Sequence, residues 1–223
     1  MSARSEVLAR IRAANAAAGT STGAAGGTAA PEPARGYRTA GEHRPGAPAL
    51  LELLRDRLVD YRATVLDTDG DGIPAAVARA LSGVTGPVIV PPGLPAGWCP
   101  DGVPDSGQSP AELDGFAAVV TACAAACAET GTVALDASPD QGRRALSLVP
   151  DVHVCVVRAD QVVATVPELL ALLTPTRPTT LISGPSATSD IELERVEGVH
   201  GPRTLAVVLV HGDRTVRSTP ARG

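Results

Sequence analysis

Short apolar runs alternate with segments of helical periodicity along most of this chain. Strands are predicted at 63–67, 87–91, 116–121, 131–136, 152–157, 161–165, 180–182 and 205–210, and helices at 50–61, 74–81, 142–148 and 167–173. Alternation of this kind predicts an open, mainly parallel sheet covered by helices on both faces. The predicted class is therefore α/β, with three layers in the order α/β/α.

The composition indicates what fills the core of such a sheet. Hydrophobic residues make up 44% of the 223 residues, but aromatic residues only 2%. The core must therefore be built from Ala, Val and Leu, which gain less free energy on burial than aromatic rings do. This composition suits an α/β protein, because the central strands of parallel sheets are rich in Val, Ile and Leu.

The N-terminal region differs from the rest of the chain. Residues 5–17 predict a short helix with Ser5 as its N-cap, and residues 18–48 are Gly, Ala, Thr and Pro with little to bury. We expect a helix and flexible linker over 1–47, one domain over 48–215 and a tail over 216–223.

Charge argues against several partners. The net charge is −5 without a basic run, which is unlike a protein that binds nucleic acid or an anionic membrane. No apolar stretch reaches the length of a membrane span, and charged residues such as Arg4 and Arg10 interrupt the N-terminus, so a cytoplasmic location is expected. All nineteen basic residues are arginine, which excludes a lysine Schiff base and a P-loop lysine.

Two patterns resemble metal sites, and neither is complete. Cys123 and Cys127 are four apart in an Ala-rich stretch and would share one face if that stretch were helical, but they supply half a site at best. Residues 67–73 match the first half of a calcium loop, yet its twelfth position is Ala78. A strand-to-helix turn with Asp71 or Gly72 near the cap explains it better, so we expect no metal or cofactor on this chain.

A polar loop follows the apolar run 180–182. Hydroxyls and carboxylates crowd residues 183–192, and a strand that ends in such a turn and enters a helical turn directs backbone N–H groups toward an anionic ligand. The alternative is an ordinary connection in which Asp190 caps the following helical turn.

Three separated stretches resemble one known family. They are Ser-Gly-Pro-Ser-Ala-Thr-Ser-Asp-Ile-Glu at 183–192 with Glu-Gly-Val-His-Gly-Pro at 197–202, Ala-Glu-Thr-Gly-Thr-Val at 128–133, and Arg-Ala-Leu-Ser-Leu-Val-Pro-Asp-Val-His at 144–153. In this order they resemble the lactate-utilisation (LUD) domain family, and within it the short LutC-type proteins, from about residue 50 to residue 210.

The resemblance implies a fold, a pathway and partners. The fold would be NagB/RpiA/CoA-transferase-like. The protein would be cytosolic, required for L-lactate use, and would act with two iron–sulfur proteins. Iron–sulfur clusters are expected on those partners, because the ferredoxin-like cysteine runs of larger relatives are absent here.

The motifs supply the candidate site residues. Glu129 and His200 are candidates for acid/base chemistry, with a solvated carboxylate and a structural histidine as the alternatives. The ligand-binding candidates are Thr130, Gly131, Thr132, Arg143, Arg144, Ser183, Gly184, Pro185, Ser186, Thr188, Asp190, Glu192 and Gly201. The 183–192 loop and Glu129 are expected to open into one crevice, which would take a small carboxylic acid. Arg143 and Arg144 are equally well explained as solvent-exposed. His153 is predicted to be a core histidine.

Two functions of different kinds follow. The first is an accessory subunit of an iron–sulfur-dependent system that oxidises L-lactate to pyruvate. The second is a self-sufficient enzyme of the CoA-transferase or sugar-phosphate-isomerase kind, in which Glu129 would be only loosely similar to the transferase nucleophile. A purely structural scaffold would leave the polar loop unexplained. The sequence leaves open whether the chain is itself an enzyme.

Overall fold

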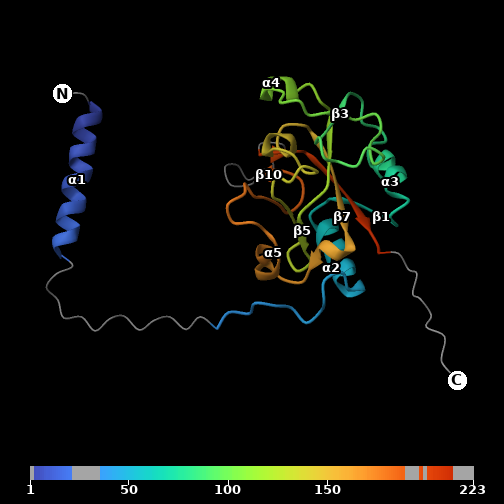
Figure 1. Ribbon diagram of the computed structural model, residues 1–223, viewed down its shortest axis with the longest axis horizontal. Coiled ribbons are helices and arrows are strands. Elements are labelled where there is room, and N and C mark those ends of the chain that lie inside the picture. Colours follow the sequence, from blue (N-terminus) through green and yellow to red (C-terminus); the bar gives the residue numbers. More distant parts are fainter. Residues whose placement is uncertain (1–2, 22–35, 189–195, 198–199, 213–223) are drawn as a thin grey trace. The chain divides into compact units, whose positions relative to one another are not determined.

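The computed structural model describes residues 3–21, 36–188, 196–197 and 200–212. It contains two compact units, Met1–Tyr37 and Arg38–Gly223. The described part of the first unit includes helix α1 (Ala3–Ser21), on which the side chains of Val7, Leu8 and Ile11 are exposed. The second unit contains every other described element (Figure 1).

A parallel six-stranded sheet forms the centre of the second unit. Its order is β1-β12-β7-β4-β2-β3, and every neighbouring pair is parallel. The strands are β1 (Thr64–Thr68), β2 (Val88–Val90), β3 (Val103–Pro104), β4 (Ala118–Thr121), β7 (Val152–Arg158) and β12 (Thr204–Val210). The predicted parallel α/β sheet is confirmed.

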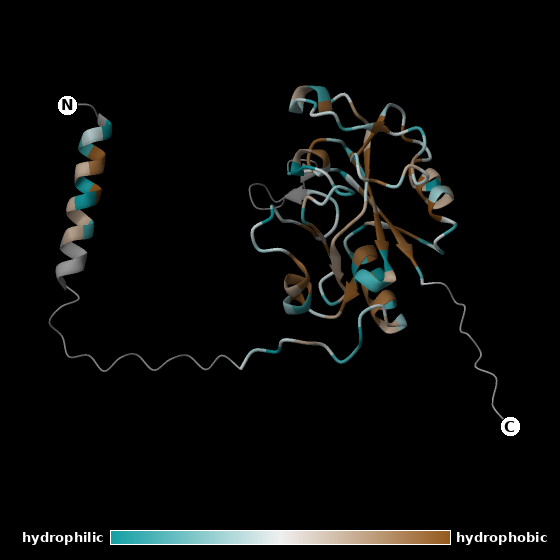
Figure 2. Cartoon of the chain, in the orientation of Figure 1, coloured by the Kyte–Doolittle hydropathy of each residue, from teal (hydrophilic) through white to brown (hydrophobic). Residues whose placement is uncertain are grey.

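Helices cover the two faces of this sheet because successive strand residues point to opposite sides. Helix α3 (Ile73–Ala80) packs on one face, against a cluster that includes Val154 and Val208. Helix α2 (Pro48–Asp60) packs on the other, with Leu54 among residues such as Val207. The strands are the most apolar part of the domain in Figure 2, whereas the helices carry polar residues on their outer surfaces.

A second, mixed sheet lies on the α2 side. Its order is β8-β5-β6-β9, with β5–β6 and β6–β9 antiparallel and β5–β8 parallel. The strands are β5 (Ala125–Cys127), β6 (Thr132–Leu135), β8 (Val162–Val163) and β9 (Thr180–Ile182). Residues of this sheet share the α2 core cluster on one side, and α5 (Val166–Leu172) packs on the other.

Cys123 and Cys127 do not share a helix face, because the Ala-rich stretch between them is not helical. Cys127 ends strand β5, and Cys123 lies just before that strand. Alanine favours helices, but these residues are fully buried between strands that satisfy their backbone groups, so tertiary context overrides local propensity. Both thiols are free and buried.

Short elements complete the unit. They are α4 (Pro110–Leu113), the 3₁₀ turns at Arg144–Ser147 and Ala159–Gln161, and the antiparallel pair β10 (Ala187–Thr188) and β11 (Val196–Glu197). The loop after β9 therefore enters a β-ribbon where a helical turn was expected, because strand pairing satisfies the backbone there. Asp190 and Glu192 lie outside the described residues.

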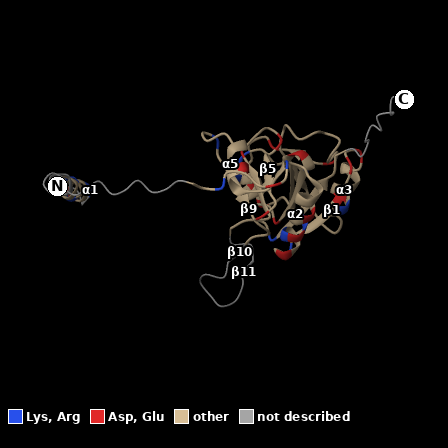
Figure 3. Ribbon diagram, turned by 90° about the horizontal axis from the view of Figure 1, so that it is seen from below, with Lys and Arg blue, Asp and Glu red and all other residues tan. Residues whose placement is uncertain are grey.

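The calcium-like stretch folds as the strand-to-helix turn that was predicted. Gly72 is the N-cap of α3, and its backbone N–H donates to Asp69 Oδ1 at 2.8 Å. Charged positions are interspersed along the helices and loops in Figure 3 rather than gathered in one basic stretch. Within the described ranges, no helix combines the length and apolarity that a bilayer crossing needs.

Candidate functional site

A cavity of about 220 Å³, here called the amino-edge cavity, lies where strands β7 and β12 begin. Its walls come from four places along the chain, at Ser147–Leu148, His153, Thr180–Ser186, and His200–Pro202 with Leu205. A cavity of this volume is smaller than the range of about 300–1,000 Å³ that is typical of drug-sized ligands. It therefore suits a small molecule.

Backbone bonds hold the two polar motifs of the cavity together. The Ser186 N–H donates to the Pro202 carbonyl oxygen at 2.8 Å, and the His200 N–H donates to Ser186 Oγ at 3.0 Å. Gly184 has a φ of +88°, and a Cβ there would lie 2.7 Å from Cβ of Tyr61 at the end of α2. Only glycine fits this close approach, so the 183–186 turn is fixed against α2.

The hairpin between β5 and β6 lies beside that turn. Thr132 Oγ1 is 2.8 Å from both Thr130 Oγ1 and Ser183 Oγ, which makes a chain of three hydroxyls. Gly131 has a φ of +61°, and a Cβ there would lie 2.7 Å from Arg57 Cβ. Both motifs are therefore packed on the last turn of α2.

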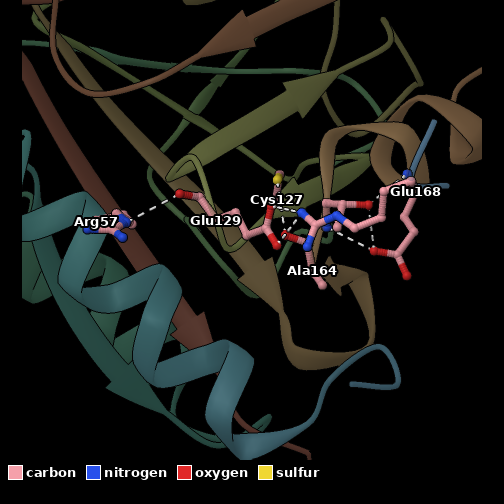
Figure 4. Close-up of polar contacts among 7 residues, drawn as sticks. Arg57, Cys127, Glu129, Ala164 and Glu168 are labelled. Carbon is pink, nitrogen blue, oxygen red and sulfur yellow. Dashed lines mark hydrogen bonds and ion pairs between the residues drawn. The ribbon is translucent and has the colours of Figure 1, made fainter. Parts of the chain in front are cut away.

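The Glu129 carboxylate points away from this cavity. It accepts two hydrogen bonds from Arg38, at 2.6 and 2.5 Å, while Arg57 Nε donates to the Glu129 carbonyl oxygen at 3.2 Å. Hydrogen bonding to Glu129 raises the pKa of Arg38. Figure 4 shows the carboxylate on the side of Ala164 and Glu168, opposite to Arg57. Glu129, Thr130, Gly131 and Thr132 are all absent from the cavity walls, so this cavity is not the crevice that was predicted to include Glu129. The hairpin reaches the cavity wall through the hydrogen bond between Thr132 and Ser183.

The arginine candidates also lie elsewhere. Arg143 binds Asp105 through two bonds of 2.8 and 2.9 Å and donates to the Gln108 carbonyl oxygen. Hydrogen bonding to Arg143 lowers the pKa of Asp105. Arg144 is exposed. Neither arginine lines the amino-edge cavity, and the geometry favours a structural role for Arg143.

His153 is a cavity residue that the sequence analysis assigned to the core. Its side chain is only 1% exposed, as predicted, yet it forms part of the cavity wall. Its Nε2 lies 2.8 Å from Thr121 Oγ1 on β4, and burial lowers its pKa to about 4. The sequence feature that could have identified His153 as a site residue is its position at the end of the 144–153 motif, close to the beginning of a strand.

A second cavity of about 590 Å³, the carboxyl-edge cavity, lies at the opposite end of the sheet. Its polar wall is a cluster in which Asp67 pairs with Arg55 of α2 and lies 2.8 Å from His211 Nε2. Leu51 and Leu209 add apolar surface. None of these residues was predicted to bind a small ligand, although Asp67 is the first residue of the calcium-like stretch.

Comparison with known proteins assigns the family. The LUD domain model matches residues 111–210. A protein named Lactate utilization protein C from Deinococcus radiodurans is 51% identical over 169 residues, which are 72% of this chain and 79% of that protein. This chain belongs to the LUD domain family. The Lactate utilization protein C of Bacillus subtilis is 30% identical over 214 residues, covering 83% of this chain and 88% of that one.

A solved structure agrees with this assignment. The crystal structure of a DUF162 family protein from Deinococcus radiodurans superposes with a TM-score of 0.63 at 45% identity, over 73% of this chain and 96% of that one. The LUD match contains every wall residue of the amino-edge cavity, from Ser147 to Leu205. Most of the carboxyl-edge cavity, including Asp67 and His211, lies outside the matched residues.

Proposed function

We propose that this LUD protein takes part in L-lactate utilisation in the cytoplasm, as a non-redox accessory subunit of an iron–sulfur-dependent system that oxidises L-lactate to pyruvate. The observation that carries the proposal is the 51% identity, over 72% of the chain, to a protein named Lactate utilization protein C. The sequence has no ferredoxin-like cysteine run. We therefore expect the electrons to pass to clusters on two partner proteins.

The chain's own contribution would be the amino-edge cavity. Its described wall contains hydroxyl, imidazole and backbone groups beside Leu148, Ile182 and Leu205. Such a wall holds a small ligand by hydrogen bonds while apolar contacts exclude water. A small carboxylic acid fits this chemistry and the volume of about 220 Å³.

The transferase alternative is less well supported by the geometry. A glutamate nucleophile must reach the bound acyl group, whereas the Glu129 carboxylate is held by Arg38 and is absent from the cavity wall. No feature of the described residues favours an isolated enzyme over a subunit.

Growth on L-lactate tests the proposal. A strain that lacks this gene should grow on pyruvate but not on L-lactate, and the full-length chain supplied in trans should restore growth. The tagged chain, isolated from cells grown on L-lactate, should bring two iron–sulfur proteins with it. Equal growth of the deletion strain on both carbon sources would contradict the proposal.

A further inference from the structure

One polar side chain in the amino-edge cavity is both buried and incompletely bonded. His153 is 1% exposed, and the described residues give it a single side-chain hydrogen bond, from Nε2 to Thr121. Its other ring nitrogen, Nδ1, has no bond to a described residue. Every fully buried side-chain nitrogen and oxygen of the described chain has a partner. Among the described residues, the space next to the His153 ring is this cavity, which His153 lines.

Thr121 fixes how the ring is presented. It lies on β4 next to β7, is fully buried, and its Oγ1 is also within 3.8 Å of Cys155 Sγ. If the hydroxyl donates to Nε2, then Nδ1 carries the proton. If it donates to the sulfur instead, it accepts from Nε2–H and Nδ1 becomes an acceptor. In both arrangements the ring orientation is the same, and Nδ1 remains the atom available to a ligand.

The cavity wall also limits the charge of a ligand. The described wall residues include no arginine, aspartate or glutamate. Burial keeps the His153 ring neutral, with a pKa of about 4. A dianionic phosphate would enter such a site without a compensating charge, at a large desolvation cost. A monocarboxylate needs less compensation, and Ser183, Ser186 and His200 surround the cavity with groups that can bind it.

The geometry points to a recognition role for His153, in which Nδ1 hydrogen-bonds the 2-hydroxyl or 2-oxo oxygen of a small, unphosphorylated monocarboxylate in the amino-edge cavity. This inference rests on the proposed function, since it names the ligand class and the contact residue of the same site. It gives Thr121 the part of a positioning residue that acts through His153.

Calorimetry on the full chain tests the contact, with sodium L-lactate and sodium pyruvate as probes and 2-phosphoglycolate as the phosphorylated comparison. Asparagine places its side-chain amide near the position of Nδ1, and glutamine near that of Nε2, so the two variants form a matched pair. His153→Gln should weaken binding about tenfold or more, because a buried ligand oxygen loses its partner. His153→Asn should lose clearly less affinity than His153→Gln does. 2-Phosphoglycolate should not bind the wild type.

Thr121 provides a second, independent measurement. Thr121→Ser keeps the hydroxyl and should preserve both affinity and the ring NMR signature, whereas Thr121→Val should weaken binding and change the ¹⁵N shifts of the His153 ring. On the wild type, adding L-lactate should move the Nδ1 resonance of His153 more than that of Nε2. This NMR arm gives an answer even if a His153 variant fails to fold.

The outcomes separate this inference from the proposed function. Three results would overturn the recognition role of His153. They are an equal loss of affinity in His153→Gln and His153→Asn, an Nδ1 resonance that does not move, and tighter binding of 2-phosphoglycolate than of L-lactate. A wild type that binds neither L-lactate nor pyruvate would overturn the ligand class. In each case, growth of the complemented strain on L-lactate would still support the proposed function.

Discussion

The two cavities lie at opposite ends of one parallel sheet and satisfy their polar groups differently. At the carboxyl edge, Asp67 is paired with both Arg55 and His211, so the charges of this cluster neutralise one another. At the amino edge, His153 Nδ1 has no bond to a described residue. Ligands of open parallel sheets usually bind at the carboxyl edge, and the larger cavity is there. The comparison favours the smaller cavity as the binding site, because its buried histidine has a ring nitrogen without a bond to any described residue.

The largest effect is expected at the glycine that shapes the amino-edge cavity. Gly184→Ala should lower the free energy of unfolding by about 3 kcal/mol, because it adds left-handed strain and a collision with Tyr61. Gly83 is the matched control, since its φ is +89° but a Cβ added there would meet nothing within 4 Å. Urea denaturation should show a clearly smaller loss of unfolding free energy for Gly83→Ala. Equal losses in the two variants would mean that the contact between Gly184 and α2 is loose.

The next effect is a pH dependence of stability at the amino edge. The pKa of His153 is about 4 in the folded chain and 6.5 as its ordinary value, so the unfolded state binds the proton first as pH falls. Its contribution to stability is present above pH 6.5 and is lost as pH falls toward 4. Between pH 6.5 and 4.5 this loss amounts to about 2 kcal/mol.

Comparison with His153→Gln isolates that contribution, because the carboxylates titrate in both proteins. The difference in unfolding free energy between wild type and variant should shrink steadily over this pH window. A constant difference would mean that the ring is not kept neutral by burial.

A smaller effect is expected at the carboxyl edge. Asp67→Asn removes the carboxylate that pairs with the Arg55 guanidinium and contacts the His211 ring, but these side chains are 35–38% exposed, so the loss of unfolding free energy should be about 1 kcal/mol. Asp101→Asn, at an exposed position, changes the net charge equally and should have less effect on the melting temperature. L-Lactate affinity should stay the same in both. A large loss of affinity in Asp67→Asn would reverse the comparison of the two cavities.

The smallest effect is expected at the ion pair beside the amino-edge loops. Arg38→Gln should leave the melting temperature nearly unchanged, because the Arg38 and Glu129 side chains are 62% and 38% exposed and solvent screens their attraction. Glu129→Gln should give the same result, and the double variant should add nothing. A drop of several degrees in the melting temperature of either single variant would mean that the segment around Arg38 holds the β5–β6 hairpin in place.

The sequence predicted the parallel sheet well because its strands are made of β-branched and apolar residues. Short apolar runs such as 152–157 and 205–210 are typical of buried strands. The mixed sheet was harder, since β5 is Ala-Ala-Cys and has no β-branched residue. Its strand conformation depends on pairing with β6 and β8, which only the folded chain supplies.

The site was predicted in part for a similar reason. The density of polar residues indicated loop positions such as Ser183, Ser186 and His200, and these line one cavity. The direction of a side chain depends on distant partners. Arg38 is 91 residues from Glu129 and holds its carboxylate outside the cavity. His153 was correctly predicted to be buried, but its contact with the cavity arises only when the β9 loop folds over the beginning of β7.

NMR mapping of L-lactate binding on the ¹⁵N-labelled full-length chain tests the central claim most directly. Amide and ring resonances are expected to shift around His153, Ser183–Ser186 and His200, and those around Arg55, Asp67 and His211 are expected to stay in place. Shifts gathered instead around Asp67 and His211, with the His153 ring unmoved, would contradict it.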